Sequence, residues 1–563
     1  MTLGDSPQHV HPTLFHRFIT PVDDSDTFDT TLSATDDEIP LVDMPRQRSS
    51  ESSITDLLLP HAPKTKHASK WRLFISICLL EICLSNQFSV VIAAANDLVA
   101  GRAPTGIVLV AYCIPSLVLR VYVSLWGLPE LNIPTLWSYA RGSKARELER
   151  EVSAAGVERE INYGERLLLS VLCCGFGAQL LAWMENIPVR VMGVALMSLS
   201  SNLGDMCVSP ATQTRDDERW GADAVENRSM IMMCSRYPKS AKYAFGGYSM
   251  GTGLSNVVGS ALYMFATSVA MMDPRAVIAL VLIGPLLALL GYHFFLPTPE
   301  SGKRRRKHGE TGAGVMALPV NKKLRIVRQL VMPYMLPLAS CFFLENVVNQ
   351  GVLPTLTFPL PFTSTPTLLA PLWNKIFHTP RDFYPVYITI NSLFSLLGRS
   401  TITLFRLRDG ESRSIMLFGV LIAVEGVILL LQVVNSVNLS AAITDGGELG
   451  LYTSGPGGVV GLIAVMGFVL GLVFCNIYWD LGNKPLPEGV YTALRRGQRG
   501  QGEGVLGNGE GEELEGKLGR EEEMELREFL LGTVAPGDTV AIMVAGVVAM
   551  WVQGVLRGLR ENE

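Results

Sequence analysis

The chain has 563 residues, of which 48% are hydrophobic and only 18% are charged, with a formal net charge of −5. These values fit a polytopic membrane protein and disfavour a soluble enzyme of this length. The nine cysteines and eight histidines show no disulfide framework, no metal-ligand spacing and no catalytic constellation. We therefore expect no enzymatic activity, no cofactor, no metal and no nucleic-acid partner.

The N-terminal segment, residues 1–64, is rich in Ser, Thr, Asp and Pro and has little apolar periodicity. It is predicted to be a disordered cytosolic tail and does not have the pattern of a cleavable signal peptide.

Eleven apolar stretches of about twenty residues follow, each long enough to cross a bilayer as a helix. An all-α, polytopic membrane protein is therefore predicted. The stretches lie near residues 72–95, 105–128, 165–184, 189–209, 243–270, 275–296, 327–350, 384–405, 415–437, 457–479 and 536–557.

Lys and Arg residues gather in alternate loops, as in the linker 297–326 with its run Lys303–Lys307. Basic loops normally stay in the cytosol. The N-terminus is therefore predicted to be cytosolic and, after eleven spans, the C-terminus lumenal.

Three segments outside the spans have their own signatures. The Pro-rich segment 352–383 is too broken for a span and is predicted to lie on the lumenal membrane face. Asn438 begins a glycosylation sequon that is predicted to face the lumen. The Gly/Glu-rich segment 490–529 is predicted to be a low-complexity cytosolic insert that ends in a charged helix.

The stretch from Cys341 to Gly351 carries a carboxylate and three amides inside an apolar run. In a regular helix, Glu345 and Asn349 share one stripe, and Asn346 and Gln350 share the adjacent one. A charge at bilayer depth costs about 2.5–3.5 kcal/mol and normally faces a cavity or a partner. The alternatives are a substrate or proton pathway and a hydrogen-bonded clamp between helices.

Short sequence echoes indicate a duplication. Glu81 with Asn86 in the first stretch resembles Glu345 with Asn349 in the seventh, and Arg120 in the second resembles Arg399 in the eighth. Two parallel halves are therefore predicted, a six-helix half at 65–296 and a five-helix half at 327–563, the second lacking a counterpart of the sixth helix.

Charges of both signs lie within the apolar stretches, so pairing between them can offset part of their insertion cost. Arg120 and Arg399 are suited to binding an anionic group and Glu345 to carrying protons, although Arg120 lies near a span end and can also snorkel to the interface. The candidate pathway residues are Asn86, Arg120, Asp205, Glu345, Asn349, Gln350 and Arg399.

Several short motifs occur in order along the apolar stretches, among them Ser85–Phe88, Ser198–Asp205, Ser249–Gly253, Asn349–Gly351 and Gly398–Ser400. Together they resemble the battenin family of lysosomal and vacuolar membrane proteins, which looks related to the major facilitator fold. Tyr112 stands where the family has an acidic residue, Arg120 where it has a lysine, and Glu81 has no family counterpart.

The resemblance implies residence in the vacuolar membrane. It also implies a part in vacuolar pH homeostasis and in transport of basic amino acids or of small polar metabolites such as glycerophosphodiesters, by alternating access. The partners expected are then the lipid bilayer, a small-molecule substrate and protons. The alternative is a non-transporting membrane scaffold that regulates trafficking through its cytosolic loops.

Overall fold

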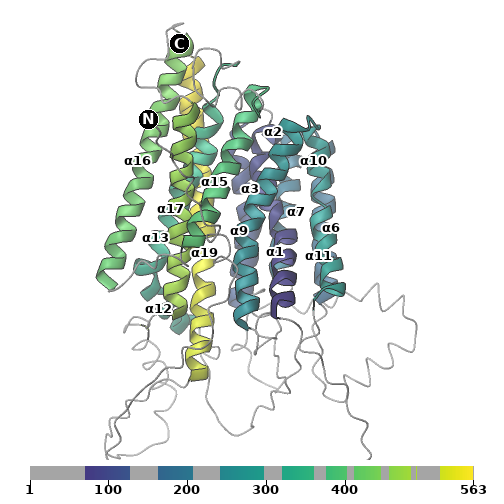
Figure 1. Cartoon of the computed structure of the whole chain (residues 1–563), viewed down its shortest axis with the longest axis vertical. Coiled ribbons are helices and arrows are strands. Elements are labelled where there is room, and N and C mark those ends of the chain that lie inside the picture. Colours follow the sequence, from purple (N-terminus) through teal and green to yellow (C-terminus); the bar gives the residue numbers. More distant parts are fainter. Residues whose placement is uncertain are drawn as a thin grey trace, which may run out of the picture. The chain divides into compact units, whose positions relative to one another are not determined.

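The structure, a computed structural model, describes nine longer segments and residue 490. Within them the secondary structure is helical without any strand, so the predicted all-α class is confirmed (Figure 1). All these helices belong to one compact unit, His67–Glu563. The predicted tail 1–64 lies outside the described residues, which are 70–99, 101–126, 163–206, 241–296, 320–360, 376–401, 411–444, 456–483, 490 and 520–561.

The helices before the basic linker form from apolar runs with few charges, because a helix satisfies its own backbone hydrogen bonds in lipid. They are α1 (Lys70–Ala93), α2 (Ala95–Val99), α3 (Gly106–Trp126), α6 (Tyr163–Trp183), α7 (Ile187–Met206), α9 (Ala241–Met264), α10 (Pro274–Leu280) and α11 (Ile283–Phe294).

Two π-helical turns, η5 (Val331–Met335) and η6 (Val348–Val352), and two short 3₁₀ turns, η7 (Leu353–Thr355) and η8 (Pro380–Asp382), lie among the described helices after the linker. The longer helices are α12 (Val320–Leu330), α13 (Leu336–Val347), α15 (Phe383–Ser400), α16 (Glu411–Thr444), α17 (Pro456–Asn483) and α19 (Arg520–Glu561).

The structure places a helix at each of the eleven predicted stretches. In the described part of the chain, six helical segments are long and apolar enough to cross a membrane by length and composition. Helices α3, α6 and α7 supply shorter apolar segments. Helices α9 and α15 are long enough but are less apolar, because Gly, Ser and other polar residues interrupt them. The chain is thus a multi-pass membrane protein, and the number eleven stays a prediction.

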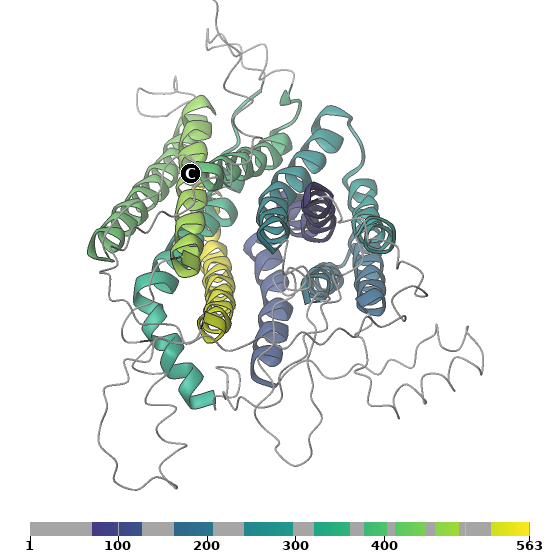
Figure 2. The same cartoon turned by 60° about the horizontal axis from the view of Figure 1, so that its bottom comes forward.

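The packing of the helices repeats between the two halves. In the first half, α1 packs on α9 and α7, α3 packs on α7, and α6 packs on α7. The corresponding pairs of the second half also pack, namely α13 with α19 and α17, α15 with α17, and α16 with α17. The two halves meet where α3 lies beside α19 and α9 beside α15 (Figures 1 and 2). The predicted two-half, major-facilitator-like architecture therefore follows from the packing itself.

The two halves differ at one helix position. Helix α11 packs on α1 and α6, and no described helix fills the matching place beside α13 and α16. There α13 and α16 pack directly on each other, whereas their counterparts α1 and α6 are separated by α11. Within the described residues, the second half thus has direct packing of α13 on α16 where the first half has α11.

Several boundaries differ from the sequence prediction. Helix α16 extends beyond the predicted 415–437, and α19 joins the charged helix of the 490–529 insert to the last apolar stretch as one helix of 42 residues. Helix α12 begins inside the predicted linker 297–326. These polar extensions are helical because α12 and the start of α19 pack on each other and bury Ile326, Leu330, Leu526 and Leu530.

The Pro-rich segment also differs in its described parts. Leu353, Leu356 and Phe358 on one side and Phe377 on the other are buried in the main apolar core. These flanks are therefore packed into the molecule and do not lie on a membrane face, because their large apolar side chains fill space between the helices.

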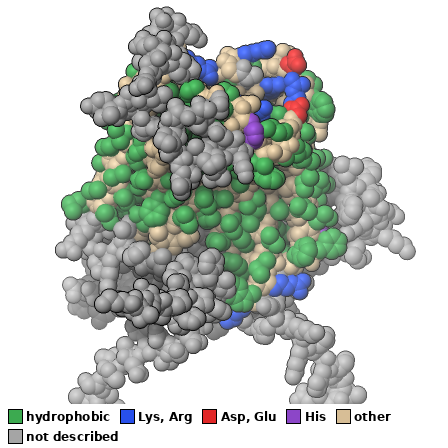
Figure 3. All heavy atoms as spheres, turned by 45° about the horizontal axis from the view of Figure 1, so that its top comes forward, with side chains coloured by type: hydrophobic (Ala, Val, Ile, Leu, Met, Phe, Trp, Pro, Cys, Tyr) green, Lys and Arg blue, Asp and Glu red, His purple; other side chains and the backbone are tan. Residues whose placement is uncertain are grey.

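Large apolar side chains cover much of the outer surface (Figure 3). Met332 and Phe294 are each 73% exposed and Trp551 is 70% exposed. Extended apolar surface on this scale is unfavourable in water, and it is the surface expected of helices that face lipid.

Candidate functional site

Glu345 lies on α13 and is buried, with 7% of its surface exposed. The side-chain amide of Asn391, on α15, donates a hydrogen bond of 2.5 Å to Oε1 of Glu345. A charge-assisted hydrogen bond of this kind offsets part of the cost of burying a carboxylate. The site therefore starts from a hydrogen-bonded pair that joins the seventh and eighth predicted spans.

The polar stretch continues from α13 into the π-helical turn η6, which contains Asn349 and Gln350. In such a turn, backbone hydrogen bonds to the fifth residue replace those to the fourth. The side chain of Asn349 nevertheless interacts with Glu345, so the predicted proximity of these two residues is retained. All four polar residues of the stretch are buried. The amide of Asn346 donates to the carbonyl of Phe342, whereas the amide of Gln350 faces Tyr384. π-Helical turns often occur at functional sites.

Arg399, on α15, is the cation that acts electrostatically on Glu345. Its guanidinium lies over the ring of Phe474 with 4.2 Å between Cζ and the ring centroid, and it acts electrostatically on Glu345. Its Nε has no hydrogen-bond partner in the described part of the molecule, and the two residues are not within ion-pair distance there. Arg399 therefore compensates Glu345 through space and keeps donor capacity for another group.

Arg120 belongs to a second polar cluster, which joins both halves. Its Nε donates to Oδ1 of Asn202 at 3.1 Å, and its Nη1 donates to the hydroxyl of Thr539 at 3.2 Å. Ser116 also donates to Oδ1 of Asn202, at 2.9 Å. Helices α3, α7 and α19 thus fix the position of the Arg120 guanidinium beside Asp538, so the snorkelling alternative is not needed to explain it.

Two of the predicted pathway residues are placed elsewhere or are not described in full. Asn86 faces Gly284 of α11, inside the first half, and so does not join Glu345. Asp205 lies in α7, but its side chain is outside the described part of the structure.

Three further carboxylates of the described helices have distinct surroundings. Glu81 is buried and accepts a hydrogen bond of 2.6 Å from Ser85. Asp538 follows Gly537 in α19 and is acted on by both Arg120 and Arg399. Glu425 is fully buried on α16, and the thiol of Cys341 lies close to it.

Asn438 lies in the last turns of α16 and is half-buried. It falls inside the apolar segment Met416–Leu439 rather than in a loop. Glycosylation acceptors normally lie in surface loops, so the helical position disfavours modification of this sequon.

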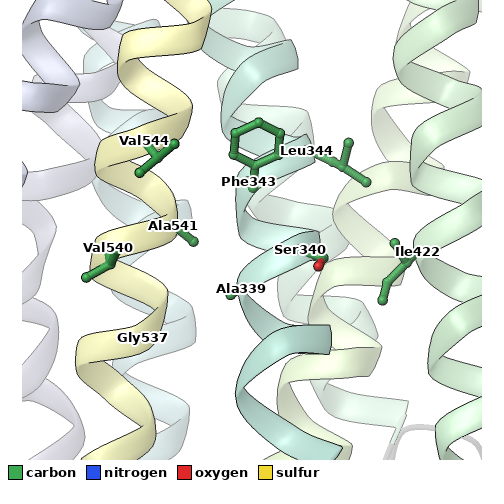
Figure 4. Close-up of a pocket in the computed structure, with 9 residues that line it drawn as sticks. All are labelled: Ala339, Ser340, Phe343, Leu344, Ile422, Gly537, Val540, Ala541 and Val544. Atoms are coloured by element: carbon green, nitrogen blue, oxygen red, sulfur yellow. The ribbon is translucent and has the colours of Figure 1, made fainter. Parts of the chain in front are cut away.

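An apolar pocket of about 490 Å³ lies between α13, α16 and α19 (Figure 4). Ser340 is the only side chain with a polar atom among its nine lining residues, which are Ala339, Ser340, Phe343, Leu344, Ile422, Gly537, Val540, Ala541 and Val544. Glu345 and Arg399 do not line it. The pocket thus lacks the polar groups that a charged metabolite requires.

Sequence reasoning missed Asn391, Asn202 and Thr539, which partner the residues it selected. The signal for Asn391 is an amide inside the apolar stretch 384–405, the same kind of signal that selected Asn349. In the described residues there is no cluster of three His, Cys, Asp or Glu side chains with the geometry of a metal site.

A third set of contacts joins the halves near the start of α3. The backbone N–H of Thr105 donates to Oε1 of Gln553 at 2.8 Å, and its hydroxyl donates to the carbonyl of Gln350 at 2.6 Å. The backbones of α3 and α19 approach closely here, since a Cβ added to Gly106 would lie 2.4 Å from the carbonyl oxygen of Gly546. The polar turn η6 is therefore tied directly to the opposite half.

Two solved structures of transporters are similar over most of the chain. The nucleoside transporter NupG is 10% identical and covers 88% of this chain and 97% of its own, with a TM-score of 0.39. A bacterial homologue of the human lysosomal transporter Spinster is 13% identical and covers 87% and 98%, with a TM-score of 0.37. The two-half architecture rests instead on the helix packing described above.

Curated relatives match nearly the full length. Protein BTN1 of Cryptococcus neoformans is 24% identical over 560 residues, which cover 87% of this chain and 94% of the relative. Protein BTN1 of Mycosarcoma maydis is 22% identical and covers 88% of each chain. Protein btn1 of Schizosaccharomyces pombe is 24% identical and covers 72% and 84%. The CLN3 protein family matches residues 225–317 and 304–558, more than half of the chain. With that match and the polar, two-half helical structure, the chain belongs to the CLN3 protein family.

Proposed function

We propose that the protein is a non-enzymatic vacuolar membrane transporter that moves a small polar metabolite by alternating access between its two halves. The family membership and the helix packing support a membrane transporter. The observation that carries the proposal is the buried group formed by Glu345 and Asn391, with the Arg399 guanidinium close to it. A buried carboxylate beside a cation with free donor capacity is a costly arrangement that packing alone does not require.

In this proposal Glu345 is a proton-carrying acid. Arg399 and Arg120 attract the anionic part of a substrate from opposite halves, and both act electrostatically on Asp538. Basic amino acids and glycerophosphodiesters both contain an anionic group that such a pair can bind. Transport coupled to protons in this way would contribute to the pH homeostasis of the vacuole.

The test compares Glu345→Gln, Arg399→Gln and the double variant for abundance and for substrate flux in isolated vacuoles, with the substrate first identified by metabolite profiling. Glu345→Gln keeps the shape and the hydrogen-bonding capacity of the side chain and removes its titratable charge. We expect normal abundance and lost flux for both single variants. Glu185→Gln is the control, because the Glu185 side chain is 77% exposed.

Other outcomes separate the alternatives. Stranding one charge of a structural ion pair costs about 3–5 kcal/mol, so low abundance that the double variant restores would indicate a clamp. Normal flux in both single variants would contradict the site. Unchanged vacuolar metabolites after removal of the protein would favour the trafficking scaffold.

A further inference from the structure

An ion pair connects the two halves at the end of the molecule opposite the predicted basic loops. Asp97 lies in α2, just after α1, and Arg381 lies in η8, just before α15. The Nε of Arg381 is 2.6 Å from Oδ1 of Asp97. Because α1 and α15 belong to different halves, this contact must break or rearrange whenever the halves separate at this end.

The second oxygen of Asp97 also has a partner. The hydroxyl of Tyr263, near the end of α9, donates a hydrogen bond of 2.6 Å to Oδ2. The Asp97 side chain is only 14% exposed and that of Arg381 is 39% exposed. Tyr263 itself is fully buried, so its ring holds the carboxylate in one orientation from the side of the first half.

The turn that carries Arg381 is held rigidly. Thr379 and Asp382 form a capping box, and Pro380 occupies the first turn. Oδ2 of Asp382 accepts from the backbone N–H of His378 at 2.9 Å and of Thr379 at 2.8 Å. The cap fixes the backbone at Arg381, so pairing with Asp97 needs to order only the Arg381 side chain.

Neighbouring contacts fix the chain around Asp97. Arg190, at the start of α7, donates to the carbonyl of Leu98 at 2.7 Å. Arg557, at the end of α19, donates to the carbonyl of Gly101 at 3.2 Å. The segment between α1 and α3 is thus anchored to its own half by Arg190 and to the other half by Arg557 and Arg381.

We propose that Asp97, Arg381 and Tyr263 form an interhalf latch, which holds the two halves closed at this end and opens during the transport cycle. The latch rests on the proposed transport function, but its opening can be measured without any substrate. It also differs from the Glu345 site, since none of its residues contacts that site.

The experiment is hydrogen–deuterium exchange of the purified full chain in lipid nanodiscs. Asp97→Asn and Arg381→Gln each remove one charge of the latch. Hydrogen bonds to charged groups contribute about 1.5–3 kcal/mol, so peptides covering α2 and η8 should both exchange about tenfold faster in each variant. Exchanging the charges, with Asp97→Arg and Arg381→Asp together, should restore much of the protection.

A matched control exists inside the first half. Glu185 and Arg275 form an exposed ion pair at 3.6 Å whose two residues belong to the same half. Glu185→Gln should leave the exchange of α2 and η8 unchanged. Tyr263→Phe, which keeps the ring and removes the donor, should accelerate exchange in α2 more than in η8.

Unchanged exchange in both single variants would overturn the latch, as would equal acceleration throughout α6 and α7, which would indicate general destabilisation. Failure of the transport proposal would appear instead as normal flux in Glu345→Gln. The two outcomes are therefore distinguishable.

Discussion

The buried carboxylates of this protein differ in how far hydrogen bonds offset the cost of burying them. Glu81 accepts from Ser85, and Glu345 accepts from Asn391. Neither oxygen of Glu425 has a hydrogen-bond partner in the described residues, although the thiol of Cys341 lies close. A thiol is a weak donor, so the cost of burying Glu425 is the least compensated of the three.

We expect Glu425→Leu to leave the protein at least as stable as the parent. Replacing a buried, poorly paired polar group with an apolar side chain of similar size is often neutral or stabilising by about 1–4 kcal/mol. The measurement is thermal unfolding in detergent. A large fall in the unfolding temperature would show that Glu425 has a strong partner, and Glu425→Gln would then identify whether charge or shape is needed.

The sequence predicted the burial of Glu345 because a carboxylate within an apolar run must face inwards. It did not predict Asn391 as the partner, since which amide meets the carboxylate depends on how α13 and α15 pack. Asn86 shows the reverse case. Its position in an apolar run is the same kind of signal, but the structure turns it towards Gly284 of α11.

At the scale of elements, glycines decide how closely helices approach. Helix α17 packs on α15, where a Cβ added to Gly471 would lie 2.1 Å from the carbonyl oxygen of Ser395. A Cβ added to Gly461, in the same helix, would have no neighbouring atom within 4 Å. Small residues of this kind let backbones of membrane helices pack tightly.

Gly471→Ala should therefore destabilise the protein, since overpacking typically costs about 1–3 kcal/mol. Gly461→Ala should be neutral or slightly stabilising, because the methyl group meets no neighbour. Thermal unfolding of the two variants checks this pair. Equal effects would mean that α17 shifts away from α15 without cost.

Helix positions were largely predictable because each follows from an apolar run of suitable length. The ends were less predictable. A charged helix at the end of the 490–529 insert was predicted, but not that it continues into the last apolar stretch as the single helix α19, in which Leu526, Leu530 and Val534 are buried against neighbouring helices. The π turn η6 was not predicted either, because its sequence is compatible with a regular helix.

At the scale of the whole molecule, the duplication seen in short sequence echoes corresponds to repeated helix packing. The echoes alone were weak evidence, since four-residue matches arise by chance in apolar sequence. The packing is stronger because it involves many helix pairs at once. The contacts between halves, such as Asp97 with Arg381, have no such sequence signal, since they join residues far apart in the chain.

Helix α19 has 42 residues, whereas its apolar segment, Pro536–Leu559, has 24. At 1.5 Å per residue the whole helix is about 63 Å long, twice the roughly 30 Å of a hydrocarbon core. The turns before Pro536 are therefore not needed to cross a hydrocarbon core, and they pack on α12 instead. A displacement of the first turns of α19 would therefore be transmitted to its crossing with α3 within one continuous helix, without an intervening loop.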